Sequence, residues 1–139
     1  MRHTTTTLLT ACLLLTSAAV GCSNSGDENA RDCATALTER TGGDPADTPT
    51  VGEAKERVAA LDETLAGMVR SGNEGVAKEA FDAFDRKAKE GGKDRPEACA
   101  PLSEEDYTAL LTAKAIDGLG WTGEDGQFDK LKMVESLGD

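Results

Sequence analysis

Apolar residues recur at helical spacing in several stretches of the chain, and the clearest lies between residues 54 and 69. Charged residues, Arg57 among them, fill the opposite face of this stretch. Its apolar positions, separated mostly by steps of three and four, are Ala54, Val58, Leu61, Leu65, Met68 and Val69. Thr50 and Glu53 precede it at the spacing of a capping box, which satisfies free backbone amides at a helix start. The pattern predicts an amphipathic helix that begins next to Thr50.

A second apolar stripe follows after a break of only a few residues. Ser71-Gly72-Asn73 interrupts the helical pattern, which then resumes and continues to Gly91-Gly92. The apolar positions of this second stripe are Val76, Ala77, Ala80, Phe81, Phe84 and Ala88. Because so short a link joins neighbouring antiparallel helices, the two stretches predict a helix hairpin.

Two shorter helices are expected on either side of this hairpin. Residues 30–40 carry an apolar face, and Gly42-Gly43 ends that helix. Ser103 is followed by three acidic residues, which is typical of an N-cap at the positive end of a helix dipole. The apolar stripe that begins there runs to Gly118.

A last helix is expected from about Asp125 to Leu137. Its apolar stripe consists of Phe128, Leu131, Val134 and Leu137, with Met133 alongside. No window of the chain alternates with a period of two, so the sequence predicts no sheet. The expected fold class is therefore all-α, a small antiparallel helical bundle of four to five helices.

The first residues have the order of a secretory signal. A short positive start, Met1-Arg2-His3, leads to an apolar run from Leu8 to Val20. That run has thirteen residues, whereas a transmembrane helix, the alternative interpretation, takes about 20 apolar residues. The segment Ala19-Val20-Gly21-Cys22 resembles the lipobox of bacterial lipoproteins, with Ala19 in place of the commonest Leu.

The resemblance covers residues 1–22 and implies a lipid anchor. In that family the cysteine thiol takes a diacylglyceryl group and a peptidase cuts just before it, so residues 1–21 are a signal peptide and Cys22 is lipidated. Whether the amino group of Cys22 is also acylated stays open. Residues 22–29 are then the lipidated cysteine and a polar, flexible tether, and residues 30–139 form the helical domain.

The remaining cysteines predict one disulfide. Cys12 leaves with the signal peptide and Cys22 carries lipid, so the exported domain keeps only Cys33 and Cys99. An even number of thiols in an oxidising compartment is typical of a disulfide. The alternative, a nucleophile or metal pair, needs a nearby base or further ligands, and the sequence offers no Cys-x-x-Cys spacing for it.

Charge excludes one class of partner. Without residues 1–21, which contain Arg2, the chain keeps 14 Lys and Arg against 26 Asp and Glu, a formal charge of −12. Such an excess repels phosphate backbones, so we expect no nucleic-acid partner. The acidic clusters on the predicted hairpin fit a solvated face better than a catalytic pair. They are Glu53, Glu56, Asp62, Glu63, Asp82 and Asp85.

The lack of histidine removes most hydrolase chemistry. The single histidine, His3, lies in the signal peptide, so the exported chain has no residue for a catalytic triad or a His-ligated zinc site. Residues 124–129 resemble part of a calcium loop, but Trp121 and Gly123 stand where that loop needs Asp or Asn, and Lys132 stands where it needs Glu. We read the segment as an acidic helix start, and expect no cofactor and no metal.

These observations favour a non-enzymatic surface lipoprotein, held on the outer face of the cell membrane, whose helical module binds an envelope protein or cell-wall component. The alternatives are a small envelope enzyme with paired carboxylates, or a ligand or cation carrier. Trp121, in a glycine-rich turn, is either a possible partner contact or a plug at the end of the bundle. A concave pocket with convergent carboxyl groups of perturbed pKa would favour the enzyme.

Overall fold

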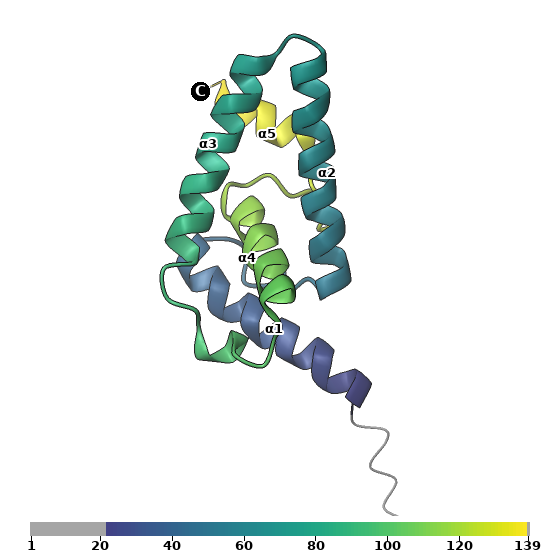
Figure 1. The fold of residues 1–139 in the computed structure, drawn as a ribbon, viewed down its shortest axis with the longest axis vertical. Coiled ribbons are helices and arrows are strands. Elements are labelled where there is room, and N and C mark those ends of the chain that lie inside the picture. The colour runs from purple at the N-terminus through teal and green to yellow at the C-terminus, as the bar shows by residue number, and fades with distance from the viewer. Residues whose placement is uncertain (1–21, 139) are drawn as a thin grey trace, which may run out of the picture.

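The computed structural model describes residues 22–138, and their side chains from residue 26 onward. The predicted signal peptide, with the lipobox-like residues Ala19, Val20 and Gly21, lies outside the described residues. The described chain forms helices α1 (Cys22–Thr41), α2 (Val51–Arg70), α3 (Glu74–Gly91), a 3₁₀ turn η1 (Glu97–Cys99), α4 (Glu104–Gly118) and α5 (Lys130–Leu137) (Figure 1). The all-α prediction is confirmed. Among these residues, β-type backbone pairing is limited to one isolated antiparallel bridge between Thr122 and Phe128.

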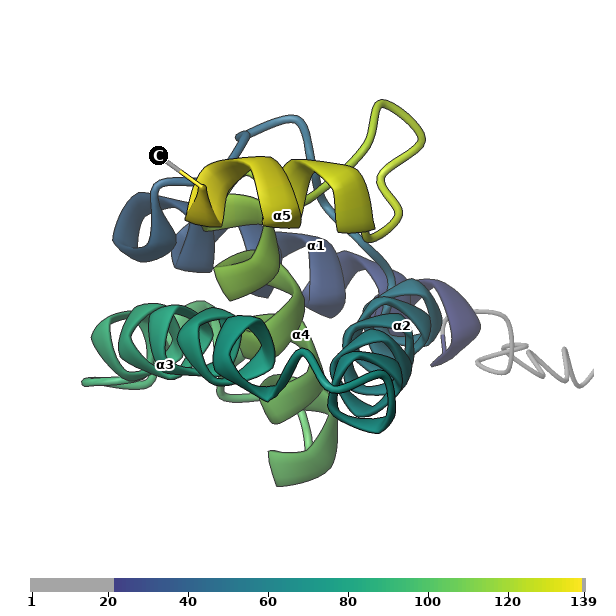
Figure 2. The same cartoon turned by 90° about the horizontal axis from the view of Figure 1, so that it is seen from above.

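Helix α4 is the centre of the bundle, because α1, α2 and α3 each pack against it (Figures 1 and 2). Its sequence explains this position, since Ala109, Leu110, Ala113, Ala115 and Ile116 are all buried and alanines let neighbouring helices approach closely. A helix that is apolar on most sides needs neighbours on most sides. Helix α5 packs against α3.

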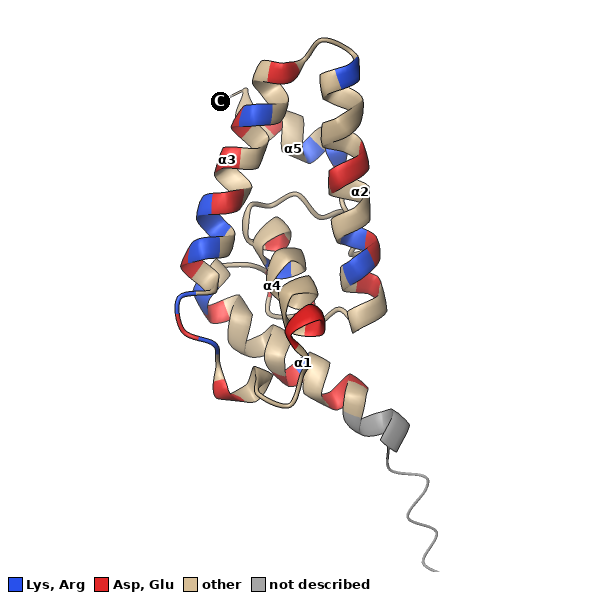
Figure 3. Ribbon diagram, in the orientation of Figure 1, with Lys and Arg blue, Asp and Glu red and all other residues tan. Residues whose placement is uncertain are grey.

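The predicted helix starts at Thr50 and Ser103 are confirmed. The Glu53 amide donates to the Thr50 hydroxyl at 3.2 Å, and the Thr50 amide donates to the Glu53 carboxylate at 2.8 Å, which completes the capping box. The Asp106 amide donates to the Ser103 hydroxyl at 3.2 Å. The α2–α3 hairpin is likewise confirmed, and charged residues recur along the length of both helices (Figure 3).

Helix α1 begins earlier than the sequence predicts. A flexible tether was expected over residues 22–29, but the helix runs from Cys22 through this segment and extends beyond the body of the domain (Figure 1). Gly26, Asp27 and Glu28 are exposed, as their composition predicts. Lengthening an existing helix costs little compared with starting one, so a polar segment next to a packed helix can continue it.

The start and the buried face of the last helix were also predicted wrongly. Helix α5 begins at Lys130, because the Asp129 carboxylate accepts from the amides of Leu131 and Lys132 at 2.9 and 3.2 Å. Its buried residue is Met133, whereas Leu131 is 72% exposed. Glu124 and Asp125, earlier in the chain, belong to a turn rather than to the helix start.

The described residues contain no helix with both the length and the apolar character needed to cross a bilayer.

The predicted disulfide is confirmed. Cys33 in α1 and Cys99 in η1 are bonded, with 4.5 Å between their Cα atoms, and both side chains are fully buried. Leu37, Tyr107 and Leu110 pack around the bond in one of the two apolar clusters of the core. The bond therefore holds the segment between α3 and α4 against α1.

Removing the disulfide should destabilise the domain strongly. The bond closes a loop with a sequence separation of 66 residues, and the double variant Cys33→Ala/Cys99→Ala should lower the free energy of unfolding by about 2–5 kcal/mol in urea titrations. Mass spectrometry of digested exported protein should recover the Cys33–Cys99 cross-linked peptide. Free thiols at both positions would contradict the assignment.

Candidate functional site

Two positive charges are buried beside α4. Lys114 is fully buried, and Arg57 is 2% exposed. The sequence analysis placed Arg57 on the charged face of its helix, which is wrong, because Arg57 lies on the same face as the buried Ala54 and Leu61. An unpaired charge in a protein interior costs several kcal/mol, so both side chains need partners.

Asp47, in the loop between α1 and α2, pairs with both cations. The two terminal nitrogens of Arg57, Nη1 and Nη2, donate to the Asp47 carboxylate at 2.8 and 3.0 Å, as a bidentate pair. Lys114 Nζ donates to the backbone carbonyl of Asp47 at 2.7 Å and lies 3.5 Å from its carboxylate. Arg57 also donates to the backbone carbonyls of Ala113 and Gly126. The loop is thereby fixed to α2 and α4 at once.

Asp117, near the end of α4, completes the network. Its carboxylate accepts from Lys114 Nζ at 2.8 Å, from the Asp44 amide at 2.8 Å and from the Thr122 hydroxyl at 2.9 Å. These bonds join the loop before α2 to the segment after α4. The network has two cations and two carboxylates, so its formal charge is zero.

The environment of Asp47 favours its ionised form. Burial alone raises the pKa of a carboxyl group, but the hydrogen bonds and the positive charges of Arg57 and Lys114 outweigh burial and lower the pKa of Asp47 below 3.8. A general acid in a glycosidase needs the opposite shift.

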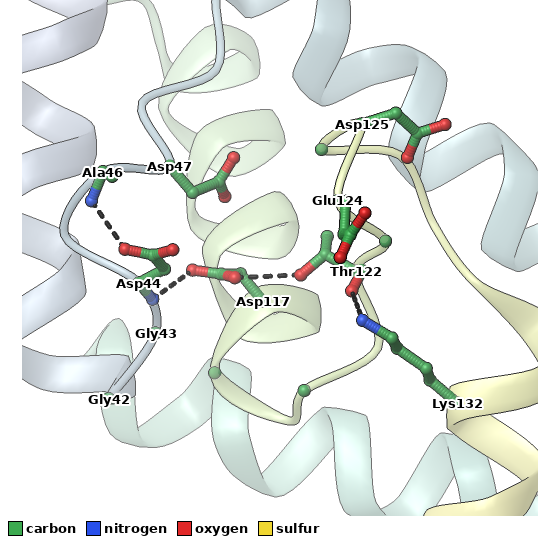
Figure 4. A pocket seen from close by; sticks show the side chains of 14 residues that line it. Gly42, Gly43, Asp44, Ala46, Asp47, Asp117, Thr122, Glu124, Asp125 and Lys132 are labelled. Atoms are coloured by element: carbon green, nitrogen blue, oxygen red, sulfur yellow. Dashed lines mark hydrogen bonds between the residues drawn. The ribbon is translucent and has the colours of Figure 1, made fainter.

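A cleft of about 710 Å³ lies above this network. Figure 4 shows the loop at residues 42–47 on one side, the turn at 122–126 on the other, and the end of α4 between them. The cleft is rich in glycines and carboxylates. Its lining residues are Gly42, Gly43, Asp44, Ala46, Asp47, Asp117, Gly118, Gly120, Thr122, Gly123, Glu124, Asp125, Gly126 and Lys132.

Glycine is required where α1 and α4 meet below the cleft. A Cβ atom at Gly118 would lie 2.2 Å from the backbone oxygen of Thr41, and one at Gly43 would lie 2.1 Å from the Asp117 carboxylate. The C-terminal ends of both helices therefore approach each other in backbone contact. Both ends carry the negative pole of a helix dipole, which adds to the negative potential of the cleft.

The two carboxylates in the floor of the cleft have structural roles. Asp47 and Asp117 are engaged by Arg57, Lys114 and Thr122, which leaves neither poised to transfer a proton or to attack a substrate. Among the described residues, no group of three or more Cys, Asp or Glu is arranged to hold a metal ion.

The turn that resembles a calcium loop is closed by its own hydrogen bonds. The Gln127 amide donates to the Asp125 carboxylate at 3.0 Å, and Gly126 adopts a φ of 75°. The prediction that this segment starts a helix with an acidic cap is confirmed for Asp129, the N-cap of α5, but is wrong for Glu124 and Asp125, which lie in the turn between the paired residues Thr122 and Phe128.

Of the two alternatives for Trp121, a partner contact or a plug at the end of the bundle, the structure supports the plug. The indole is 1% exposed and donates from Nε1 to the Ser136 hydroxyl at 2.7 Å, in a cluster with Ile116 and Met133. The prediction of a possible partner contact at Trp121 is therefore wrong, since the buried ring has no free surface to offer.

Sequence reasoning did not identify the four charged residues of the network, although the positions of two of them in apolar stripes indicated burial. Lys114 interrupts the apolar run Ala113-Lys114-Ala115-Ile116, and Arg57 falls three residues after Ala54 and four before Leu61. A cation at a core position of an apolar stripe predicts a buried partner. Nothing local identifies Asp47 as that partner, because it lies in a loop.

Removing Asp47 should destabilise the fold by leaving Arg57 and Lys114 with an uncompensated buried charge. Asp47→Ala should cost about 3–5 kcal/mol in urea unfolding. The matched control is Asp62→Ala, at an exposed position of α2, which should change stability by less than about 0.5 kcal/mol. Equal effects of the two substitutions would contradict the role given to Asp47.

The same residue predicts the acid sensitivity of the fold. Because the pKa of Asp47 is lower in the folded state than its ordinary value of 3.8, its contribution to stability is complete above that value and is lost as the pH falls through the folded pKa. The free energy of unfolding should therefore fall between about pH 5 and pH 2, and fall less steeply in Asp47→Asn. Identical pH dependence of the two proteins would refute this assignment.

Comparison of the chain with models of protein families, with curated proteins and with solved structures found no match.

Proposed function

We propose that the protein is an exported lipoprotein, held on the outer face of the cell membrane by lipid on Cys22, whose helical domain is a non-enzymatic binding module for a protein or another component of the cell envelope. The observation that carries this proposal is the buried Cys33–Cys99 disulfide in a chain that begins with a lipobox-like segment.

The disulfide supports export. Such bonds form and persist in oxidising compartments and are rare where the cytosol keeps thiols reduced. Both sulfurs are fully buried beside Leu37 and Leu110, so the bond is part of the core rather than an exposed pair of thiols. A core of this kind is expected in a domain that folds after crossing a membrane.

The direction of α1 suits an anchor at Cys22. The helix begins at Cys22 and extends beyond the body of the domain before it reaches the core (Figure 1). Its length of 20 residues corresponds to about 30 Å at 1.5 Å per residue. Lipid on Cys22 would therefore meet the bilayer at one end of α1, while the cleft beside Gly42 and Gly43 lies at the other end.

Binding is favoured over catalysis by the state of the carboxylates. The enzyme alternative needs two carboxyl groups with different protonation states, one of them a proton donor. Asp47 has its pKa shifted downward, and Asp117 accepts three hydrogen bonds. The formal charge of −12 after Cys22 argues against nucleic acid as the partner.

Lipid attachment should depend on Cys22 and on no other cysteine of the leader. Cys22→Ser should abolish metabolic labelling with palmitate, whereas Cys12→Ser, inside the signal peptide, should leave the labelling unchanged. Intact mass of the purified native protein should correspond to a chain that begins at Cys22 and carries acyl groups. An unmodified chain that still begins at Met1 would refute the proposed anchor.

A further inference from the structure

The α2–α3 hairpin has one covered face and one open face. On the covered face, α5 packs against α3 and buries Met133 in a cluster with Met68, Ala77 and Ala80. The open face carries a shallow apolar groove of about 310 Å³. The groove is lined by Leu65, Ala66, Val69, Glu74, Ala77, Lys78 and Phe81.

Two large apolar side chains of this groove are exposed. Phe81 is 52% exposed and Val69 is 48% exposed, whereas Phe84, whose ring centroid lies 6.5 Å from that of Phe81, is partly buried in the core. Leu65 and Val69, four residues apart on α2, line the groove together with Phe81 of α3, while the small Ala77 is buried. A docked helix can place apolar anchors one turn apart against Leu65, Val69 and Phe81.

The charges at the rim favour a basic occupant. Asp62 shares the α2 face of Leu65 and Val69, and Glu74 lines the groove itself. On α3, Lys78 is paired with Asp82 at 2.5 Å, and Asp85, one turn after Phe81, is paired with Lys89 at 2.6 Å. The four carboxylates and the two ammonium groups leave these positions with a formal charge of −2, and α3 carries residues of both signs (Figure 3).

The same charges disfavour a second copy of the chain as the occupant. Two copies would bring together surfaces of the same sign on chains that each carry a formal charge of −12 after Cys22. Like charges placed opposite one another across an interface cost free energy and suppress association. A positively charged partner is instead attracted by the negative potential of these carboxylates.

Helix α5 is an internal precedent for the kind of segment that fits. Its eight residues, Lys130–Leu137, bury one apolar side chain against the hairpin and carry Lys130 and Lys132 on exposed positions. It is a short amphipathic helix with two lysines in its first turn. The hairpin therefore already packs one short amphipathic helix on its covered face.

We propose that the groove between α2 and α3 is the docking site for a short amphipathic helix of a partner protein, with apolar anchors one turn apart and Lys or Arg beside them. This inference rests on the proposed function, because it names the kind of partner that the binding module takes. The groove lies toward the hairpin end of the domain, away from the start of α1 (Figure 1), so an anchor at Cys22 leaves it open to proteins outside the membrane.

The test uses the full chain carrying Cys22→Ser, so that binding is measured without lipid. The probe is a synthetic Leu/Lys amphipathic helix of about 14 residues, long enough to form a helix, and the control is a scrambled peptide of the same composition without an apolar stripe. In ¹⁵N-labelled protein, the amphipathic peptide should shift the amide signals of residues 65–69 and 77–81. The scrambled peptide should bind at least about tenfold more weakly.

Variants separate the groove from the rest of the surface. Phe81→Ala should weaken binding by about tenfold or more, and Leu131→Ala, at an equally apolar exposed position on α5, should leave it unchanged. If Phe81→Ala lowers the melting temperature, Val69→Ser at the other wall of the groove provides the same test.

Three outcomes would overturn the docking site. They are no shifts at millimolar peptide, equal binding of both peptides, or shifts confined to the cleft at residues 42–47 and 122–126. A dimer of the free protein that Phe81→Ala dissociates would assign the groove to a second copy instead. None of these outcomes affects the lipid mass on Cys22, so failure of the docking site is distinguishable from failure of the anchor.

Discussion

Arg57 and Lys114 bring two positive charges into the interior of a small domain, and their burial is possible because Asp47 and Asp117 lie within hydrogen-bonding distance of them. A buried ion pair contributes little net stability compared with well-packed apolar residues, but breaking one is costly. Its main effect in this fold is to determine position. The loop before α2 is polar, with little apolar surface to bury, and the charge network fixes it to α2 and α4. After α4, Trp121 packs in the core and the Thr122 hydroxyl donates to Asp117.

The cleft is a consequence of that constraint. Its two sides are the polar segments that Asp47 and Asp117 hold in place, and its base is the close approach of α1 and α4 at Gly118. The apolar groove has a different origin, since it remains where α5 covers only one face of the α2–α3 hairpin. The domain thus has two hollows in its surface, one polar and acidic and one apolar. Both lie away from the start of α1, where we propose the lipid.

Local sequence signals predicted the local structure well. The capping box at Thr50 and the cap at Ser103 depend on residues three positions apart, and the hairpin depends on a short link between two periodic stretches. The pairing of Cys33 with Cys99 followed from counting thiols. The predictions that failed depended on distant contacts or on small energy differences. A polar segment continued α1 because propagation is cheap, and Asp129 displaced the expected start of α5 by capping it.

The cleft was beyond sequence reasoning for a related physical reason. Lys114 and Arg57 stand at core positions of apolar stripes, which signals burial, but the partner that makes this burial possible comes from a loop whose path no periodic pattern describes. The groove could not be foreseen either. Val69 and Phe81 belong to apolar stripes that predict burial, and the sequence alone does not say which residues of a stripe the last helix covers and which it leaves exposed.

A double-mutant cycle on Asp47 and Arg57 tests most directly whether this charge network fixes the fold. The free energies of unfolding of Asp47→Ala, Arg57→Met and the double variant give the coupling between the two side chains. The account predicts that the loss from Asp47→Ala is reduced by at least about 1.5 kcal/mol once Arg57 is replaced, because the uncompensated charge is then gone. Additivity within about 0.5 kcal/mol would contradict it, since the two side chains would then act independently.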